Sequence, residues 1–361
     1  MTVQQQKIQD DPLGLKSLRT RVLVWATVLL IALAVAAFLG ITVGAVPLTL
    51  GETLNVIAHH TLTPHSPITW SPSVDAIIWQ VRLPRVLLAV VVGASLAVSG
   101  MVLQAMVRNV LAEPYLLGIN SGASAGAALA ILFGAGVGAF GAHALQATAF
   151  LGALASSIAV YLLARTGGRI TSLRLLLAGV AVGYALNAVT SFLIFASGDA
   201  EGTRSVMFWL LGSLSLAAWG TPLTATVIIT ALTGIIFWAM SKHLDVLSVG
   251  DESAVSLGIS PEKIRLILLV IISLNVGVVV ATVGSIGFVG LIIPHLARRC
   301  AGALHRASLP IAALMGATLL TLADLVARTV LAPQEIPIGI LTALVGTPFL
   351  LVLIKKMRSY S

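Results

Sequence analysis

The chain has 361 residues, of which 58% are hydrophobic and only 9% are charged, and its mean hydropathy is +1.04. A typical soluble domain is about 25% charged, so a soluble protein of this length could not bury so much apolar surface. The net charge of +8 would suggest nucleic-acid binding in a soluble protein, but cytoplasmic loops of membrane proteins carry the same excess of Lys and Arg. The composition therefore predicts an all-α polytopic membrane protein with no nucleic-acid partner.

The N-terminal segment is long and polar, and no small-residue cleavage site follows it at the right place for a secretory signal peptide. We expect residues 1–21 to be a cytoplasmic tail, 22–354 a single transmembrane domain and 355–361 a second cytoplasmic tail. A spanning helix needs about 20 mostly apolar residues, and about ten such helices are predicted. Their ranges are 22–44, 86–106, 115–133, 143–163, 175–195, 221–240, 266–284, 286–302, 308–330 and 336–354.

Two stretches are less regular than the rest. The sequence GSIGFVG at 284–290 must form a reversal inside a long apolar stretch. The segment 205–219 is apolar but short, and its Trp residues suit a membrane interface. We expect a helix there that lies at the surface or dips into it.

The Lys and Arg residues separate between the two sides of the membrane. Ten spans place both termini on one side, and 17 of the 21 Lys and Arg residues then lie on that side. This bias predicts that both termini lie in the cytoplasm. The cations left outside are Arg82, Arg85, Arg204 and Arg328.

Patterns for catalysis and for resident cofactors are missing. The sequence contains no Walker A motif and no HExxH, CxxC or GxSxG, so we expect no catalytic residue and no ATP, metal or other cofactor bound by this chain. His59, His60 and His65 are close in sequence, but their spacing fits no standard metal site. An intramembrane protease would need two facing carboxylates, and Asp324 is the one that the sequence clearly places in the membrane.

Three of the external arginines have notable neighbours. Asp324 and Arg328 stand four residues apart and can pair on one helix face, so we expect an intramembrane ion pair that orients the arginine. Arg82 and Arg85 flank Pro84 at a helix start. They could snorkel at the interface, but external cations in a pair also suit carboxylates on a soluble partner.

Several motifs then resemble one family, in the order expected for it. They lie at 82–126 (beginning RLPRVLLAVVVGASLAVSG), 247–260 (LSVGDESAVSLGIS), 284–298 (GSIGFVGLIIPHLAR), 322–328 (LADLVAR) and 334–351 (QEIPIGILTALVGTPFLL). The chain resembles the FecCD or BtuC-like permeases of ABC importers for iron chelates, haem and cobalamin. The resemblance implies a type II importer permease of the bacterial inner membrane with ten transmembrane helices, which is not itself an enzyme.

The resemblance also implies partners. Two permease subunits, identical or homologous, line a central pathway, and two cytoplasmic ATPase subunits bind ATP and Mg²⁺ and drive transport. A soluble extracytoplasmic binding protein delivers the cargo. In the family, arginines of the RLPR and LADLVAR-like motifs pair with acidic residues of that protein, and Arg82, Arg85 and Arg328 match those positions.

The segment 247–260 resembles the family's coupling segment, which docks into the ATPase. Its acidic residues favour a helix N-terminus. Its small apolar residues, which include Val255, offer a docking surface, and its last glycine can stop the helix. The residues expected to act in coupling are Leu247, Gly250, Asp251, Glu252, Ala254, Leu257 and Gly258.

The turn RNVLAEP at 108–114 corresponds to the family's cytoplasmic gate. Asn109 and Leu111 match its constricting residues, although Val110 stands where many members have proline.

Polar residues in or beside the predicted spans are candidates for the pathway wall, although each could instead bond to a neighbouring helix. They are Gln104, Asn120, Ser121, Asn187 and Ser191. A weakly binding wall would suit a bulky cargo that must be released. The resemblance implies import of an iron chelate, and a siderophore is the cargo that we expect. One alternative is haem or cobalamin as cargo, and another is a secondary transporter driven by an ion gradient, which would need intramembrane carboxylates placed for protons or sodium.

Overall fold

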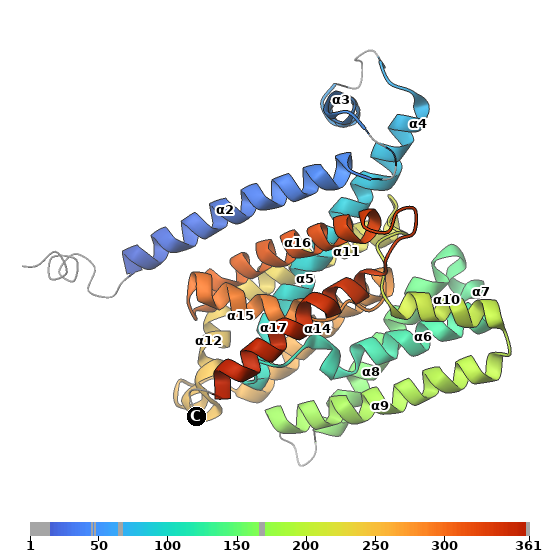
Figure 1. The fold of residues 1–361 in the computed structure, drawn as a ribbon. Coiled ribbons are helices and arrows are strands. Elements are labelled where there is room, and N and C mark those ends of the chain that lie inside the picture. Colours follow the sequence, from blue (N-terminus) through green and yellow to red (C-terminus); the bar gives the residue numbers. More distant parts are fainter. Residues whose placement is uncertain (1–14, 45, 47, 64–67, 166–169, 359–361) are drawn as a thin grey trace, which may run out of the picture.

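The protein was examined as a computed structural model, which describes residues 15–44, 46, 48–63, 68–165 and 170–358 (Figure 1). Helices account for most of these residues, and none of them lies in a β-strand, which confirms the all-α prediction. The ten longest described helices match the ten predicted ranges in order. They are α2 (Leu15–Thr42), α5 (Leu83–Val107), α6 (Ile119–Phe133), α8 (Ala144–Ala164), α9 (Ser172–Ser197), α11 (Thr221–Ala239), α14 (Pro261–Val283), α15 (Val289–Ala301), α16 (His305–Thr329) and α17 (Ile338–Arg358).

Short helices connect these long ones. They are α3 (Leu50–Thr61), α4 (Pro72–Asp75), a π-helical turn (Ala76–Arg82), 3-10 turns (Pro114–Leu117 and Gly141–His143), α7 (Val137–Phe140), α10 (Ala200–Leu210), α12 (Ser241–Val249) and α13 (Asp251–Ser256). Seven of the described helical segments are long and apolar enough to cross a membrane. The segments containing α6, α15 and α17 are the other three predicted spans.

The predicted reversal at 284–290 is present, because α14 ends at Val283 and α15 begins at Val289. However, α15 has only 13 residues and is about 20 Å long, so it does not by itself cross a bilayer core of about 30 Å. The polypeptide therefore turns back in the interior of the bundle. Hydropathy alone gave a longer span because the non-helical residues before α15 are mostly apolar as well.

The helix predicted at 205–219 lies elsewhere. The surface helix α10 covers Ala200–Leu210, and residues 212–220 are irregular. The Asp199 side chain accepts a hydrogen bond from the Glu201 backbone N–H at 3.0 Å and caps the helix at its start. The polar first turn of α10 lacks the apolar signal, so the prediction began five residues too late.

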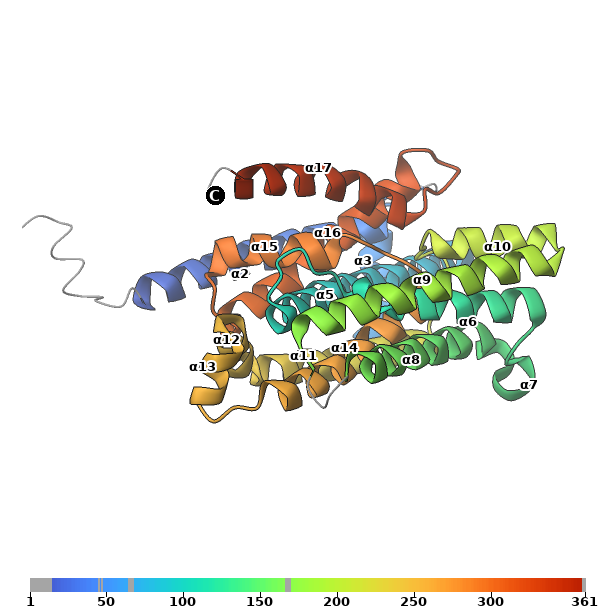
Figure 2. The same cartoon turned by 90° about the horizontal axis from the view of Figure 1, so that it is seen from below.

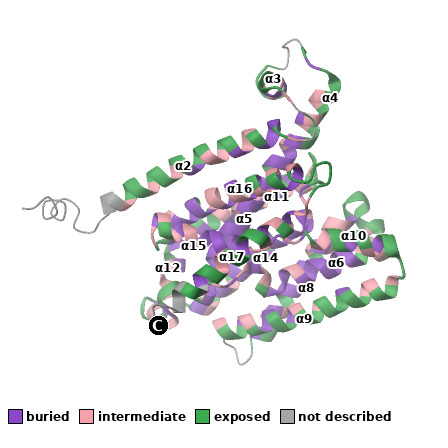
Figure 3. Cartoon of the chain, in the orientation of Figure 1, coloured by how far each residue is buried: buried purple, intermediate pink, exposed green. Residues whose placement is uncertain are grey.

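The centre of the bundle is α5, which is buried along most of its length (Figure 3). It packs against α11, α14, α15 and α16. Close approach depends on small residues, as membrane helix packing requires. A Cβ atom at Gly93 would collide with the backbone of Gly316 in α16, and one at Gly100 would collide with the backbone of Gly290 in α15. By contrast, α17 lies along one side of the bundle, beside α15 and α16 (Figure 2).

The bundle has two ends that differ in charge. At the α13 end, Arg265 at the start of α14 donates hydrogen bonds to the carbonyls of Met106 and Ile170, each at 3.3 Å. At the α3 end lie the C-terminus of α2 and the starts of α5 and α17 (Figure 1). The alternating helix directions put Arg82, Arg85, Arg204 and Arg328 at the α3 end and the other described Lys and Arg residues at the α13 end.

Candidate functional site

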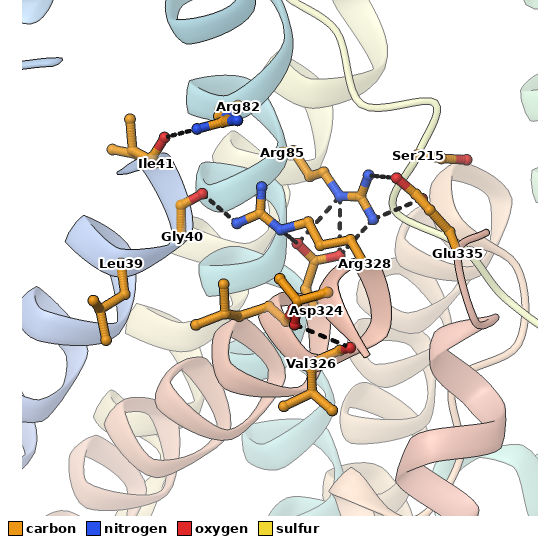
Figure 4. Close-up of polar contacts among 12 residues, drawn as sticks. Leu39, Gly40, Ile41, Arg82, Arg85, Ser215, Asp324, Val326, Arg328 and Glu335 are labelled. Atoms are coloured by element: carbon orange, nitrogen blue, oxygen red, sulfur yellow. Dashed lines mark hydrogen bonds and ion pairs between the residues drawn. The ribbon is translucent and has the colours of Figure 1, made fainter. Parts of the chain in front are cut away.

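Five charged residues from three parts of the chain meet at the α3 end, and we call them the arginine cluster (Figure 4). Arg82 and Arg85 come from the π-helical turn and the first turn of α5, and Asp324 and Arg328 from the last turns of α16. Glu335 lies in the loop between α16 and α17. The fold thereby brings together side chains that are up to 250 positions apart.

Arg85 joins two carboxylates. Its Nε donates to both carboxylate oxygens of Asp324, at 3.0 and 3.1 Å. Its two terminal nitrogens donate to the two oxygens of Glu335, at 2.9 and 3.0 Å. The Asp324 side chain is 3% exposed and that of Glu335 is 42% exposed, so Arg85 connects a buried acid to an acid that reaches solvent.

The other two arginines bind the C-terminal end of α2. Arg82 donates to the carbonyls of Ile41 at 2.9 Å and Thr42 at 2.7 Å, and Arg328 donates to the carbonyl of Gly40. The last carbonyls of a helix have no partner within it and carry partial negative charge. Both guanidinium groups therefore act as caps for α2.

This geometry corrects one expectation and adds a second partner to another. The sequence predicted outward-facing cations, but Arg82, Arg85 and Arg328 are only 5%, 7% and 8% exposed, because helix-end carbonyls and carboxylates of the same chain hold them. The sequence also paired Asp324 with Arg328. That contact exists at 3.7 Å, but the hydrogen-bonding partner of Asp324 is Arg85. Glu335 was not singled out, although it is the only acid in the QEIP motif.

A cavity of about 1010 Å³ adjoins the cluster at the same end. Its lining includes Glu335, the α10 residues Arg204, Phe208 and Trp209, and several serine hydroxyls. The Arg204 guanidinium lies 5.8 Å from the Phe208 ring centre. It is exposed and makes no ion pair with any carboxylate in the described part of the chain. The available cation at this end is thus Arg204, which the sequence reading had left without a role.

The predicted coupling segment forms a helix, as expected. After Gly250, α13 starts with Asp251 and Glu252 in its first turn. It ends in a Schellman arrangement, in which the N–H of Gly258 bonds to the Val255 carbonyl and that of Ile259 to the Ala254 carbonyl. Gly258 has φ +75°, a conformation that favours glycine. The prediction that Gly258 stops the helix is therefore confirmed.

Asp251 anchors α13 to the bundle. Both terminal nitrogens of Arg265 bond its carboxylate, at 2.6 and 2.9 Å, and Arg108 lies 3.9 Å away. The hydrogen bonds from Arg265 hold the pKa of the Asp251 carboxyl below its ordinary value. Asp251 thus holds α13 against the start of α14, in addition to its place in the first turn of α13.

Three residues assigned to the coupling surface are buried, namely Leu247, Gly250 and Ala254. Leu247 and Ala254 have no exposed area and face the bundle, whereas Val249, Val255 and Leu257 are 64–74% exposed. The reason is helical periodicity: residues close in sequence point in different directions once α12 and α13 dock.

Around the predicted gate, the Asn109 side chain accepts a hydrogen bond from the Leu111 N–H at 2.9 Å. Asn109 and Asp251 both line a cavity of about 440 Å³ at the α13 end, while Leu111 is half-buried. The turn is closed by a bond from the Ala112 N–H to the Asn109 carbonyl, so Val110 is compatible with it.

The prediction that Gln104 lines the pathway is wrong. It is 3% exposed, and its amide bonds the carbonyls of Ala112, Gly290 and Leu291 and accepts from Arg298. Ser121 is buried. Asn120 is half-buried, and its side-chain oxygen Oδ1 accepts a hydrogen bond from Ser285 Oγ at 2.5 Å. Asn187 and Ser191, one turn apart on α9, are exposed.

The histidines of the first loop form no described metal site. His60 lies 3.1 Å from Asp75 and stacks on Trp79. His65 is outside the described residues, and no group of three potential metal ligands occurs within them.

Comparison with known proteins decides the family. The profile of the FecCD transport family matches residues 13–356. The chain belongs to the FecCD transport family. It is therefore a multi-pass permease subunit of an ABC importer. Permeases of this family assemble with a second permease subunit, ATPase subunits and a binding protein.

Two relatives of this FecCD chain illustrate the range of cargo. The hemin transport permease HmuU of Yersinia pestis is 42% identical over 80% of this chain and 87% of its own length. The vitamin B12 import permease BtuC of Vibrio cholerae is 40% identical over 82% of this chain and 88% of its own length. A solved inward-facing metal-chelate type ABC transporter shares the fold with a TM-score of 0.79 and 35% identity, over 92% of this chain and 98% of that one.

Proposed function

We propose that this chain forms half of the pathway by which an iron chelate enters a bacterial cell, with a siderophore as the first candidate cargo. The single observation that supports the cargo class is the cavity at the α3 end. Its volume of about 1010 Å³ is at the upper limit of typical small-molecule pockets. A chelate is larger than most such ligands.

The lining of this cavity favours a cargo with negative charge and aromatic groups. Arg204 supplies a cation that makes no ion pair among the described residues, and Phe208 and Trp209 supply flat apolar surface beside it. A guanidinium recognises carboxylates and other oxyanions by charge-assisted hydrogen bonds. Ferric chelates with carboxylate or phenolate groups combine these features.

Haem is the second candidate, and it is favoured by the same lining. It carries two carboxylates on a flat ring, and a permease named for hemin transport is 42% identical to this chain. Cobalamin, for which other relatives are named, is the third cargo in question. Its recognition depends less on a cation.

Uptake by the complete transporter tests the cargo. The permease, its ATPase and its binding protein would be reconstituted in proteoliposomes and supplied in turn with a ferric siderophore, haem and cobalamin. We expect uptake of an anionic chelate, which Arg204→Ala lowers about tenfold, since a hydrogen bond to a charged group contributes about 1.5–3 kcal/mol. Arg165→Ala is the control, because Arg165 also lies over an aromatic ring, at 6.0 Å from that of Tyr161, but at the α13 end. Uptake of cobalamin alone would refute the proposal.

The α13 end is proposed to face the cytoplasm and bind the ATPase. The concentration of Lys and Arg at that end supports this orientation. Val249, Val255 and Leu257 form an exposed apolar surface on and beside α13, and Glu252 lies in its first turn. Asn109 and Leu111 would close the pathway next to that surface.

The arginine cluster is proposed as the docking position for acidic groups of the binding protein. Three arginines face two carboxylates, so the cluster keeps one excess positive charge. That excess would attract an acidic surface and orient it.

A further inference from the structure

We propose that Glu335 is a removable occupant of the docking position, an internal latch that a carboxylate of the binding protein displaces from Arg85. This inference rests on the docking role proposed above for the arginine cluster. It explains how an arginine that is buried and paired in the isolated chain can still receive a partner.

The two edges of the Arg85 guanidinium differ in access. The edge formed by Nε and Nη2 faces Asp324, whose side chain is 3% exposed and lies 2.9 Å from Nη2. The edge formed by Nη1 and Nη2 faces Glu335, whose side chain is 42% exposed (Figure 4). The outer edge is bound by both carboxylate oxygens of Glu335, at 2.9 and 3.0 Å. A carboxylate arriving from solvent can take the same two-bond geometry only by replacing Glu335.

The charge balance favours an exchange over a simple loss. With Glu335 removed, three arginines would face Asp324 alone, and the excess positive charge of the cluster would rise from one to two. An incoming carboxylate restores the balance. Glu335 can then enter water, because it also lines the open cavity at the same end.

The displaced residue sits in a short connection. Only eight residues, 330–337, separate α16 from α17. The N–H of Ile336 bonds the Ala327 carbonyl at 2.9 Å, and the first residue of α17, Ile338, bonds the Gly212 carbonyl at 3.1 Å. Movement of Glu335 therefore reaches the start of α17 and the residues that follow α10.

The consequence is a link between docking and the pathway. Helix α17 lies at the edge of the bundle (Figure 2), and α10 lines the cavity. Release of the latch would loosen both elements when, and only when, a partner is present at the mouth of the cavity.

The test measures binding-protein affinity for the complete permease–ATPase complex in nanodiscs. Glu335→Gln removes the competing charge, so the Kd should fall at least about fivefold, the lower limit of a typical coupling between sites. Arg85→Ala should raise the Kd by a similar factor or more. Glu52→Gln is the matched control at the same end: Glu52 is an exposed carboxylate in the capping box of α3, and glutamine preserves that motif.

The outcomes separate the latch from the docking proposal. If Arg85→Ala leaves the Kd unchanged, docking by the cluster is wrong. If Arg85→Ala weakens binding but Glu335→Gln does not tighten it, docking stands and the latch is refuted. A second measurement does not depend on affinity: spin labels at Gln334→Cys and Val137→Cys, with Cys300 replaced by Ser, should change distance when the binding protein is added. An unchanged distance would also overturn the latch.

Discussion

At the scale of single residues, the two acids bound to Arg85 make unequal contributions to stability. Asp324 is buried and is the hydrogen-bonding partner of the inner edge of Arg85, with Arg328 also close to it. Glu335 reaches solvent, which screens its charge. A single ion network therefore contains one buried acid and one acid that is open to solvent.

This inequality predicts the effect of removing each acid. Asp324→Ala should lower the free energy of unfolding by about 3–5 kcal/mol, because it leaves buried arginines without a counter-charge. Glu335→Ala should cost about 1 kcal/mol or less, as half-exposed pairs do. Denaturation of the purified permease in detergent measures both values, and equal losses would contradict the assignment.

The sequence predicted correctly where these charged residues lie, but it did not predict the hydrogen bonds between distant parts of the chain. The charge bias and the four-residue spacing correctly placed Asp324 and Arg328 next to each other at the α3 end. The bond between Arg85 and Asp324 joins residues 239 positions apart. No local spacing encodes such a contact, since it depends on how α5 packs against α16.

At the scale of helices, the end of α13 depends on one backbone conformation. Gly258 at φ +75° permits the two hydrogen bonds that close the helix. Gly258→Pro cannot adopt that conformation, because proline fixes φ near −65°.

We expect Gly258→Pro to reduce the cargo transported per ATP hydrolysed about tenfold, within the usual range of coupling free energies. Gly258→Asn should keep coupling near normal, because asparagine tolerates the left-handed region. Parallel assays of ATP hydrolysis and uptake in proteoliposomes give the ratio. Normal coupling in the proline variant would show that α13 is not the coupling helix.

Helix packing gives a second prediction at this scale. Gly100→Ala should destabilise the permease by about 1–3 kcal/mol, because the new Cβ would collide with the backbone of Gly290 and push α5 away from α15. Gly234→Ala in α11 meets no atom within 4 Å and should be neutral or slightly stabilising. Unfolding of the two variants in the same detergent compares them, and equal stability would rule out close α5–α15 packing as the cause.

The positions of the helices were easier to predict than which side of each helix is buried in the bundle. Hydropathy located the ten long helices because each needs a continuous apolar stretch, but it misjudged α10 and α15, whose limits depend on a cap and on a turn. The burial of Leu247 and Ala254 could not be read from their motif. Which side of a short helix faces the bundle is decided by tertiary contacts such as the Arg265–Asp251 pair.

At the scale of the whole molecule, the two ends have different chemistry. The α3 end holds the arginine cluster and the larger cavity, and the α13 end holds α12, α13 and most of the positive charge. An importer needs such a polarity, because cargo delivery and ATP hydrolysis occur on opposite sides of the membrane. The docking, coupling and latch proposals all share one orientation.

That orientation can be measured directly, since Cys300 is the only native cysteine. In a Cys300→Ser background, Leu62→Cys places a thiol at a position that is 81% exposed at the α3 end, and Val249→Cys places one that is 74% exposed at the α13 end. A membrane-impermeant maleimide should label position 62 in intact spheroplasts and position 249 only in inverted vesicles, because Lys and Arg are retained on the cytoplasmic side. Detergent-solubilised protein, in which both positions should react, controls for local shielding. The opposite labelling pattern would put the arginine cluster in the cytoplasm, where no extracytoplasmic binding protein could reach Arg85 or displace Glu335.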